Sequence, residues 1–456
     1  MHTFWNNFNE YKDRVAVVEQ VGKAYTYSEL QQDMERLQKK IRASYKQLIL
    51  ILAKNNYEYI VSYLAVLQNK DAVMLVNADL EESLLQTIID SYQPAYIIGD
   101  VHHEDYKSIE AGILRRNVEP DYEIFQDVAL LLSTSGTTGS LKFVKLSYEN
   151  IAANAKSISE YLHLQTDDRG LVNLPIHYSY GISIINSHLH VGASILLTND
   201  SIISKEFWKF VENEKATSLA GVPYTYQTLL RIGFQKMELP HLRYFTQAGG
   251  RLSEKLISVY AEYANRFAKK FYVMYGQTEA APRISYVPPE EILNKIGSIG
   301  KAIPNGKLTI DEETGELIYE GPNVMLGYAK DFNDLARGDE LHGKLHTGDI
   351  AEVDADGYFY IKGRMKRFIK LFGLRLNLDE IEKQLEKTLR KDVFCVGTDD
   401  KLFVVTDVMD LKDEIKRLME DLYKLHRSAF QVKVVEDIPR LANGKVNYVV
   451  LKEMML

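Results

Sequence analysis

A short polar run at residues 131–147, LLSTSGTTGSLKFVKLS, combines the residue types that a phosphate-binding loop needs. Gly136 and Gly139 allow backbone conformations that let a ligand approach the main chain closely. Lys142 comes three residues after Gly139, whereas the Walker loop places its Lys directly after the second glycine. Hydroxyl groups come from Ser133, Thr134, Ser135, Thr137 and Thr138. Taken alone, the run fits a phosphate cradle and an ordinary hairpin turn equally well.

A second stretch, MYGQTEAA at residues 274–281, ends an apolar run with a glycine turn and polar side chains. Tyr275 could stack on a base, and the Thr278 hydroxyl could bond a phosphate. Glu279 could bind Mg²⁺, which prefers oxygen ligands. The same string is also compatible with an incidental turn.

Three charged residues follow turn signals later in the chain. Asp349 follows Thr-Gly, where a carboxylate could accept hydrogen bonds from ribose hydroxyls, and Arg364 follows Gly363. Lys445 follows Asn-Gly. The simpler alternatives are a turn residue, a surface ion pair and a solvated charge.

The elements that must position these residues alternate in type. Apolar runs read as strands and amphipathic runs as helices, which predicts an α/β fold with helix-covered, mostly parallel sheets. Because ligands bind beyond the carboxyl ends of strands in such sheets, the turns at 133–142, 247–250 and 276–279 are the candidate site. Strands are expected at 47–54, 72–77, 95–100, 170–175, 193–198, 218–223, 244–250 and 269–276, and helices at 58–68, 81–92, 149–162 and 205–216.

The pattern changes in the last third of the sequence. From about Lys295, short strands and frequent Gly, Pro and Asn turns indicate a small antiparallel barrel or sheet. Near Arg364 a third pattern begins, with a helix that Asn377 or Asp379 caps. We therefore expect a large N-terminal domain at residues 1–363 and a small α+β domain at residues 364–456.

Composition narrows the function class. The 456 residues carry a formal net charge of −8 and no cluster of Lys and Arg, which argues against a nucleic-acid partner. The single cysteine, Cys395, lies in an apolar run and is expected to be a buried thiol. The sequence shows no signal-peptide core near its N-terminus and no apolar run of membrane-spanning length, so we expect a cytoplasmic protein without a membrane span.

In this order, the stretches resemble the motifs of the adenylate-forming (AMP-binding) superfamily, which includes acyl-CoA synthetases, aryl-acid ligases, peptide-synthetase adenylation domains and luciferases. The resemblance extends from TYSEL at Thr26 to Lys445. One departure is Leu141, where the family commonly has proline before the lysine. Proline would stiffen the turn, but its loss removes no hydrogen-bond donor.

The resemblance implies a role for each matching residue. The phosphate loop would be Thr134, Ser135, Gly136, Thr137, Thr138, Gly139 and Lys142, with Thr138 and Glu279 at Mg²⁺. Adenine would pack on Tyr275 and Gly276, beside a wall made of Gln247, Ala248, Gly249 and Gly250. Thr278 and Glu279 would serve the α-phosphate, and Asp349 and Arg364 the ribose. Lys445 would be the catalytic lysine and Lys366 the hinge, and His177 would gate the acyl pocket unless it is a structural histidine.

The implied reaction is ATP-dependent activation of a carboxylic acid to an acyl-adenylate, followed by transfer to a thiol. Residues 174–198 contain no acidic side chain to hold an ammonium group, which disfavours α-amino acids. An aryl or medium-length acyl acid is expected instead. The pocket residues implied are Tyr178, Tyr180, Tyr224, Gln247, Ala248, Met274 and Ala280.

Three functional alternatives remain from the sequence. Coenzyme A is the favoured thiol, and the phosphopantetheine arm of a separate acyl carrier protein is the second. The third is a nucleotide-binding regulator without turnover, which ranks lower because every motif residue is present.

Overall fold

The computed structural model describes residues 3–6, 8–20, 22–133, 142–365, 367–371, 374–398, 401–423, 426, 429–441 and 444–455. These residues form two compact units. The first holds residues 3–133, 142–307 and 319–345, and the second holds 308–318 and 346–455. The domain boundary at 363/364 stays a prediction about where the chain pivots.

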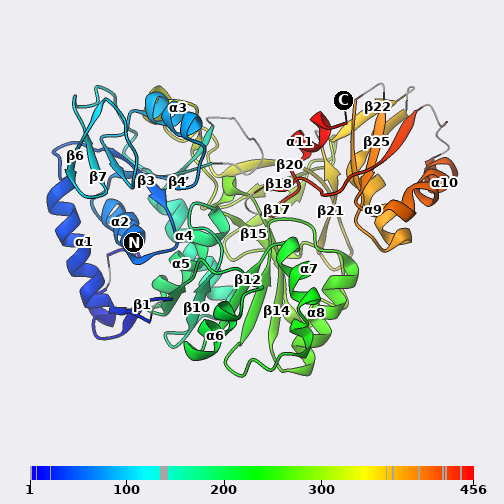
Figure 1. Cartoon of the computed structure of the whole chain (residues 1–456), viewed down its shortest axis with the longest axis horizontal. Helices are drawn as coiled ribbons and strands as arrows, with labels where there is room; N and C mark the ends of the chain where they lie inside the picture. The colour runs from blue at the N-terminus through cyan, green and yellow to red at the C-terminus, as the bar shows by residue number, and fades with distance from the viewer. Residues whose placement is uncertain are drawn as a thin grey trace. The chain divides into compact units, whose positions relative to one another are not determined.

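Three sheets and eight helices make up the described part of the first unit (Figure 1). The eight-stranded sheet has the order β19 (Gly327–Ala329), β9 (Phe143–Ser147), β8 (Val128–Ser133), β4 (Ala72–Asn77), β3 (Leu48–Ala53), β5 (Tyr96–Ile98), β7 (Ile113–Arg116) and β6 (Tyr106–Glu110). The five-stranded sheet has the order β12 (Ser218–Gly221), β13 (Tyr244–Gln247), β14 (Lys270–Gly276), β15 (Arg283–Val287) and β16 (Lys301–Ala302). The four-stranded sheet has the order β10 (Arg169–Val172), β11 (Ser194–Leu197), β1 (Val15–Glu19) and β2 (Ala24–Thr26). The helices are α1 (Tyr27–Ile41), α2 (Tyr57–Gln68), α3 (Glu82–Tyr92), α4 (Tyr148–Leu162), α5 (Ser179–His190), α6 (Lys205–Asn213), α7 (Pro223–Arg231) and α8 (Glu254–Arg266).

Parallel pairing occupies the centre of the eight-stranded sheet, whereas in the other two sheets it extends from one edge and antiparallel strands lie at the opposite edge. β3, β4 and β8 pair in parallel, whereas β9 and β19 pair antiparallel beyond them. Every residue of β3 is buried, as expected for a parallel strand that is covered on both faces. The predicted α/β class with parallel strands is confirmed, and the antiparallel edges are an addition to it.

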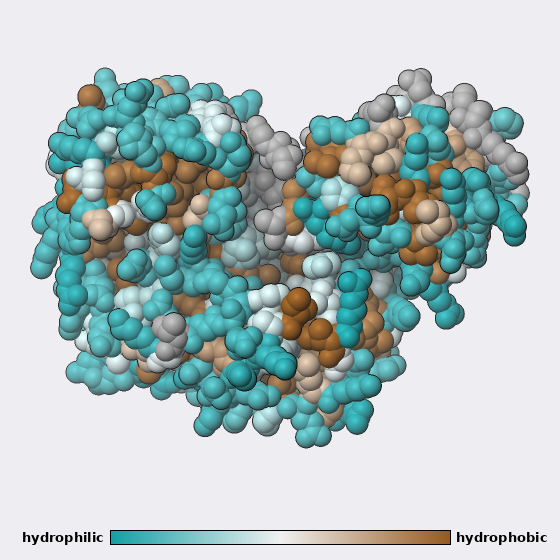
Figure 2. Space-filling view, in the orientation of Figure 1, coloured by the Kyte–Doolittle hydropathy of each residue, from teal (hydrophilic) through white to brown (hydrophobic). Residues whose placement is uncertain are grey.

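The eight-stranded sheet separates two hydrophobic cores. Ile49 and Ile51 of β3 belong to the core that includes residues of α1 and α2, while Leu48 and Leu50 belong to the core that includes residues of α3. The alternation follows from the two-residue period of a strand. Hydrophobic side chains are thereby buried, and most of the surface drawn in Figure 2 is hydrophilic, with hydrophobic residues in separate patches.

The second unit contains short sheets and three helices. It holds most of a sheet with the order β17 (Lys307–Ile310), β18 (Glu316–Glu320), β20 (Lys344–Val353) and β21 (Phe359–Arg364). It also holds β22 (Phe368–Leu371) paired with β23 (Leu374–Asn377), and the sheet β24 (Phe394–Gly397), β25 (Leu402–Thr406) and β26 (Phe430–Val434). Its helices are α9 (Leu378–Leu389), α10 (Lys412–Tyr423) and α11 (Tyr448–Glu453).

The capping signal near residue 377 is confirmed. The Asn377 side chain accepts hydrogen bonds from the backbone amides of Asp379 and Glu380, at 3.0 and 3.3 Å, and α9 begins at the next residue. Cys395 is fully buried in the core beneath α9, as predicted. The antiparallel pairing of β20 with β21 agrees with the antiparallel pattern expected after residue 295.

Four helices of the first unit, α1, α5, α7 and α8, were not assigned from the sequence. The sequence analysis assigned no helix to residues 179–190, yet α5 occupies them. In the described part of the chain, no helix combines the length and apolar character needed to cross a membrane.

Replacing Asn377 with alanine removes the cap of α9, and we expect the free energy of opening this helix to fall by about 1 kcal/mol. Hydrogen–deuterium exchange of the α9 amides in the full chain measures this change. The control is Thr388→Ala, which alters an exposed residue of the same helix and is expected to change the value by less than about 0.5 kcal/mol. Identical exchange in Asn377→Ala and the unaltered protein would contradict the assignment of the cap.

Candidate functional site

The candidate site in the first unit begins where β13 ends. β12, β13 and β14 pair in parallel, with Gly221 opposite Gln247 and Gln247 opposite Val273. The carboxyl ends of these strands therefore meet at one edge of the sheet. This edge receives the turns at 247–250 and 276–279 that the sequence analysis singled out.

The turn after β13 is tight. The side-chain amide of Gln247, which is 1% exposed, donates to the carbonyl oxygen of Gly250 at 2.7 Å. Gly249 has φ of +84°, a conformation that glycine adopts without strain. A Cβ atom on Gly250 would lie 3.1 Å from Cγ of Pro223. The expected wall residues therefore form one compact turn, with Ala248 buried beneath it.

The end of β14 also requires a glycine. A Cβ atom on Gly276 would lie 1.8 Å from the carbonyl oxygen of Pro282, so the chain before β15 passes directly over Gly276. Tyr275, next to it, is half-buried and its hydroxyl accepts from the side-chain amide of Gln277 at 3.1 Å. A short 3₁₀ turn, Thr278–Ala280, follows and carries the next two predicted residues.

Thr278 connects the end of β14 with the start of α5. Its hydroxyl lies 3.1 Å from that of Ser179, the first residue of α5, and both side chains are buried. A hydroxyl held in this way can donate to an oxyanion at the edge of the sheet.

Glu279 contacts Tyr328, which the sequence analysis did not identify. Its Oε1 accepts from the Tyr328 hydroxyl at 2.8 Å, and Nζ of Lys142 lies 3.2 Å from the centre of the Tyr328 ring. Burial, together with Glu279, raises the pKa of Tyr328, so this phenol stays protonated and donates. Oε2 of Glu279 has no hydrogen-bond partner in the part of the chain that the structure describes, so it fits the oxygen ligand that Mg²⁺ takes.

Most of the predicted phosphate loop lies outside the described residues. This applies to Thr134, Ser135, Gly136, Thr137, Thr138, Gly139 and Leu141. Lys142, at the end of that loop, is described and lies with Tyr328 and Glu279. Tyr328 was missed because no motif links it to residues that precede it by 49 positions.

His177 precedes α5 and carries an uncharged ring. Desolvation lowers its pKa to about 4, although Asp79 and a hydrogen bond with the Ala53 backbone oppose the shift. Nδ1 is buried and has no hydrogen-bond partner among the described residues. A fully satisfied structural histidine would leave no such atom, so the observation favours the gate role, which remains a prediction.

The predicted pocket residues divide into two groups. Tyr180 and Met274 line a small cavity of about 20 Å³ between α4, α5 and the five-stranded sheet. The Tyr180 hydroxyl lies 2.7 Å from Oγ1 of Thr246, and the sulfur of Met274 accepts from the Tyr161 hydroxyl at 3.0 Å. Tyr178, Tyr224, Gln247, Ala248 and Ala280 are not part of this lining.

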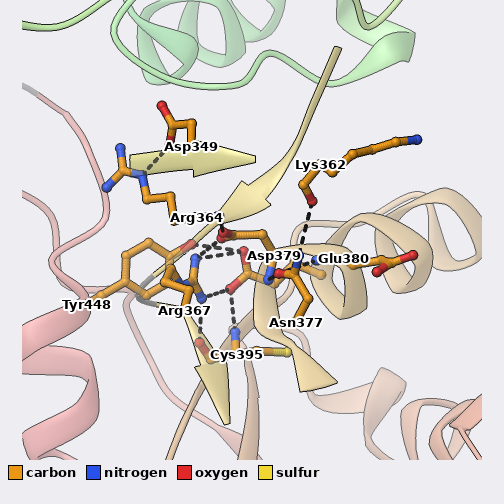
Figure 3. Close-up of polar contacts among 10 residues, drawn as sticks. Asp349, Lys362, Arg364, Arg367, Asn377, Asp379, Glu380, Cys395 and Tyr448 are labelled. Atoms are coloured by element: carbon orange, nitrogen blue, oxygen red, sulfur yellow. Dashed lines mark hydrogen bonds and ion pairs between the residues drawn. The ribbon is translucent and has the colours of Figure 1, made fainter. Parts of the chain in front are cut away.

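The two predicted ribose-binding residues lie opposite each other in the second unit. Asp349 of β20 pairs in register with Arg364 of β21, and Nε of Arg364 lies 3.4 Å from Oδ1 of Asp349 (Figure 3). Asp349 is buried, whereas the Arg364 side chain is 66% exposed. The structure thus brings these residues together, and their contact with ribose stays a prediction.

A buried ion-pair group surrounds Arg367, which the sequence analysis did not single out (Figure 3). Its guanidinium pairs with Asp379 and, at 2.7 Å, with Glu382, and it packs over the Tyr448 ring with Cζ 3.9 Å from the centre. Asp379 also accepts from the backbone amide of Arg364 at 2.8 Å. The chain on both sides of residue 366 is therefore fastened to the start of α9, while Lys366 itself lies outside the described residues.

Lys445 lies in a closed turn of the second unit. The Leu441 amide donates to the carbonyl oxygen of Lys445 at 2.7 Å, and the Gly444 amide donates to that of Leu441 at 2.8 Å. Gly444 has φ of +79°, which the Asn-Gly signal anticipated. The site residues thus fall in both units, with Asp349, Arg364 and Lys445 in the second.

Comparisons with known proteins agree with the motif order. The sequence model of the AMP-binding enzyme family matches residues 4–329. The 2-succinylbenzoate–CoA ligase of Listeria monocytogenes serovar 1/2a is 26% identical over 453 residues, covering 95% of each chain. The feruloyl-CoA synthase of an Amycolatopsis species is 28% identical over 390 residues, 80% of this chain and 78% of that protein. The solved O-succinylbenzoate coenzyme A synthetase of Bacillus subtilis, in complex with AMP, shares the fold with a TM-score of 0.79 and 20% identity, covering 99% of this chain and 98% of that one.

The neutral state of His177 predicts a loss of stability in acid. The unfolded chain binds a proton near pH 6.5 that the folded chain excludes until about pH 4, so stability falls as the pH drops through this window. At pH 5 this effect lowers the free energy of unfolding by about 2 kcal/mol relative to neutral pH. We expect His177→Phe to abolish this acid-induced loss of stability, as measured by urea unfolding at pH 7.5 and 5.0.

The control for this measurement is His241→Gln, which changes an exposed histidine. We expect its pH dependence to match that of the unaltered protein. An unchanged pH dependence in His177→Phe would show that His177 is protonated in the folded chain.

Proposed function

This chain belongs to the AMP-binding enzyme family, which confirms the resemblance drawn from its motifs, and on that premise we propose that it is an acid–thiol ligase. It activates a carboxylic acid with ATP to an acyl-adenylate, releases pyrophosphate and transfers the acyl group to coenzyme A. The names of the two relatives, both of which form CoA thioesters, support coenzyme A as the acceptor.

One observation carries the proposal. The parallel register of β13 and β14 brings the Gln247–Gly250 turn beside Tyr275, Gly276, Thr278 and Glu279. An aromatic ring, a glycine turn, a hydroxyl and a carboxylate at one sheet edge suit an adenine nucleotide with its metal ion.

The first step needs positioning and charge more than proton transfer. A substrate carboxylate attacks the α-phosphorus in line with the departing pyrophosphate, so two anions must approach each other. The Thr278 hydroxyl would hold an α-phosphate oxygen, and Lys142 and Lys445 would supply positive charge. Glu279, with Thr138, would hold Mg²⁺, which adds positive charge at the phosphates when bound.

The second step is attack of the thiol on the acyl carbonyl, with AMP as the leaving group. By family resemblance, the C-terminal domain turns about Lys366 between the two steps. The Arg364 amide and the Arg367 guanidinium both contact Asp379, so a turn about Lys366 would have to break the contact with the Arg364 amide.

The proposed substrate is an aryl or medium-length acyl acid. Residues 174–198 contain no carboxylate for an ammonium group, which disfavours an α-amino acid. The relatives are named for 2-succinylbenzoate and ferulate, which supports an aryl acid.

ATP–pyrophosphate exchange over a panel of acids tests the proposal. We expect exchange with aryl or medium-chain acids and none above background with free α-amino acids, because nothing in the 174–198 segment balances an ammonium charge. Thioester formation is then measured with coenzyme A and, separately, with a phosphopantetheine-loaded carrier protein. An amino acid as the best substrate would overturn the assigned acid class, and no exchange with any acid would favour a nucleotide-binding regulator.

Lys445→Ala should slow adenylation about 10²- to 10³-fold, since it removes a charge that acts in the transition state. The second half-reaction, started from supplied acyl-adenylate, should keep most of its rate. Lys452→Ala removes an exposed lysine of α11 and serves as the control with both rates unchanged. A similar loss in both half-reactions of Lys445→Ala would contradict the role assigned to this residue.

A further inference from the structure

A buried arginine lies in the wall of the cavity that contains Tyr180 and Met274. Arg283, the first residue of β15, is 3% exposed. Its guanidinium carbon lies 4.2 Å from the centre of the Tyr180 ring. Its Nε is buried and has no hydrogen-bond partner among the described residues. Most buried donors in folded proteins have a hydrogen-bond partner, so the unpaired Nε needs an explanation.

No carboxylate in the described part of the chain pairs with Arg283. Asp168, a buried acid that acts on the cavity residues His188 and Tyr244, is already paired with Arg243 at 2.8 Å. Arginine does not lose its proton in proteins. The cavity wall therefore carries a positive charge that no carboxylate of the described residues balances.

The other polar groups that line the cavity are occupied. The Tyr180 hydroxyl bonds Thr246, and the His188 ring lies between the Ile184 carbonyl oxygen, at 2.7 Å, and the Tyr244 hydroxyl, at 3.1 Å. Burial lowers the pKa of His188, so its ring is neutral. Among the residues that line the cavity, Arg283 is the one charged side chain.

The backbone before Arg283 is held firmly. The side-chain amide of Asn323, which is 1% exposed, donates to the carbonyl oxygens of Ala280 and Arg283 at 2.6 and 2.8 Å. The amide of Asn154 donates to the same two oxygens at 3.4 Å. The fixed main chain, together with the packing of the guanidinium on the Tyr180 ring, positions Arg283 before any ligand arrives.

Resting on the proposed activation of a carboxylic acid, we propose that Arg283 binds a second carboxylate of the substrate. The preferred acid is then a dicarboxylic acid whose far end fills the cavity. About 20 Å³ admits roughly one water-sized group, so a carboxylate oxygen can enter the cavity beside Arg283 whereas a ring cannot. The planar guanidinium can bind both carboxylate oxygens.

The reacting end of this acid would lie near Thr278. Thr278 bonds Ser179, and Tyr180, whose ring covers the Arg283 guanidinium, is the next residue of α5. The first turn of α5 would therefore lie beside both ends of the bound acid. An acid with only one carboxylate would leave the Arg283 charge without a counter-ion. The pocket therefore favours an acid with a second carboxylate.

Exchange assays with matched acids test the proposal. Adipate is compared with hexanoate, and terephthalate with benzoate, in the unaltered protein, Arg283→Met, Arg283→Lys and Arg169→Met. Arg169 is a partly buried arginine that is already paired with Glu214, at 2.6 Å, and serves as the matched control. We expect kcat/KM to favour the diacid by roughly 100-fold in the unaltered protein and in Arg169→Met. Arg283→Met should lose this preference, and Arg283→Lys should keep part of it.

Two further measurements separate this inference from the proposed function. Calorimetry with a non-hydrolysable ATP analogue measures adipate binding without turnover. Adipate binding that depends on Arg283, in the absence of exchange with any acid, would contradict the ligase reaction and support the pocket. Equal adipate binding by the unaltered protein and Arg283→Met would overturn the inference, whichever acids support exchange.

The unfolding midpoint provides the second measurement. Replacing an unbalanced buried cation with an apolar side chain should leave the midpoint unchanged or raise it, whereas Arg169→Met should lower it. A lower midpoint in Arg283→Met, together with unchanged acid preference, would show that Arg283 serves the fold and would overturn the inference.

Discussion

The parallel pairing of β12, β13 and β14 is the constraint on which the candidate site depends. It places three strand ends at one edge of the sheet, so that residues about thirty positions apart become neighbours. The start of α5 is tied to this edge through Tyr180 with Thr246 and through Ser179 with Thr278. A slip of this pairing would separate the residues proposed to bind the nucleotide from those that line the cavity.

Arg283, which is buried, and Arg367, which is partly buried, have different surroundings. Arg367 has two carboxylates and an aromatic ring around it, and it joins β21 and α9 to the start of α11. Arg283 has an aromatic ring but no carboxylate among the described residues. Removing a carboxylate beside Arg367 would leave its charge uncompensated and destabilise the fold, whereas the charge of Arg283 is available to a ligand.

The local parts of the fold could be predicted from the sequence. α2, α4 and α9 follow from periodic apolar residues, and Asn377 marks the start of α9 by a capping preference that acts over a few residues. α5 was missed because nearly all of its residues are buried, which leaves no polar face to reveal a helical period.

Contacts across long stretches of sequence could not be predicted. Tyr328 reaches Glu279 from β19, and Asp379 reaches back to Arg364, through packing that no local pattern encodes. The turns at 247–250 and 276–279 were expected at one edge of the sheet, and the register of β13 with β14 brings both to that edge. The roles of the loop at 134–141 and of Lys366, outside the described residues, remain predictions.

The close approach of Pro282 to Gly276 limits how this protein could evolve toward other acids. Gly276 pairs in register with Arg283, and successive residues of a strand point to opposite faces, so inserting or deleting one residue between them would turn position 283 away from the cavity. Asn154 and Asn323 donate to the carbonyl oxygens of residues 280 and 283, so such a change in length would also disrupt these hydrogen bonds. A lineage, or a laboratory selection, would therefore alter acid choice by exchanging side chains at constant length. Libraries that vary loop length here would mostly yield proteins without a working pocket.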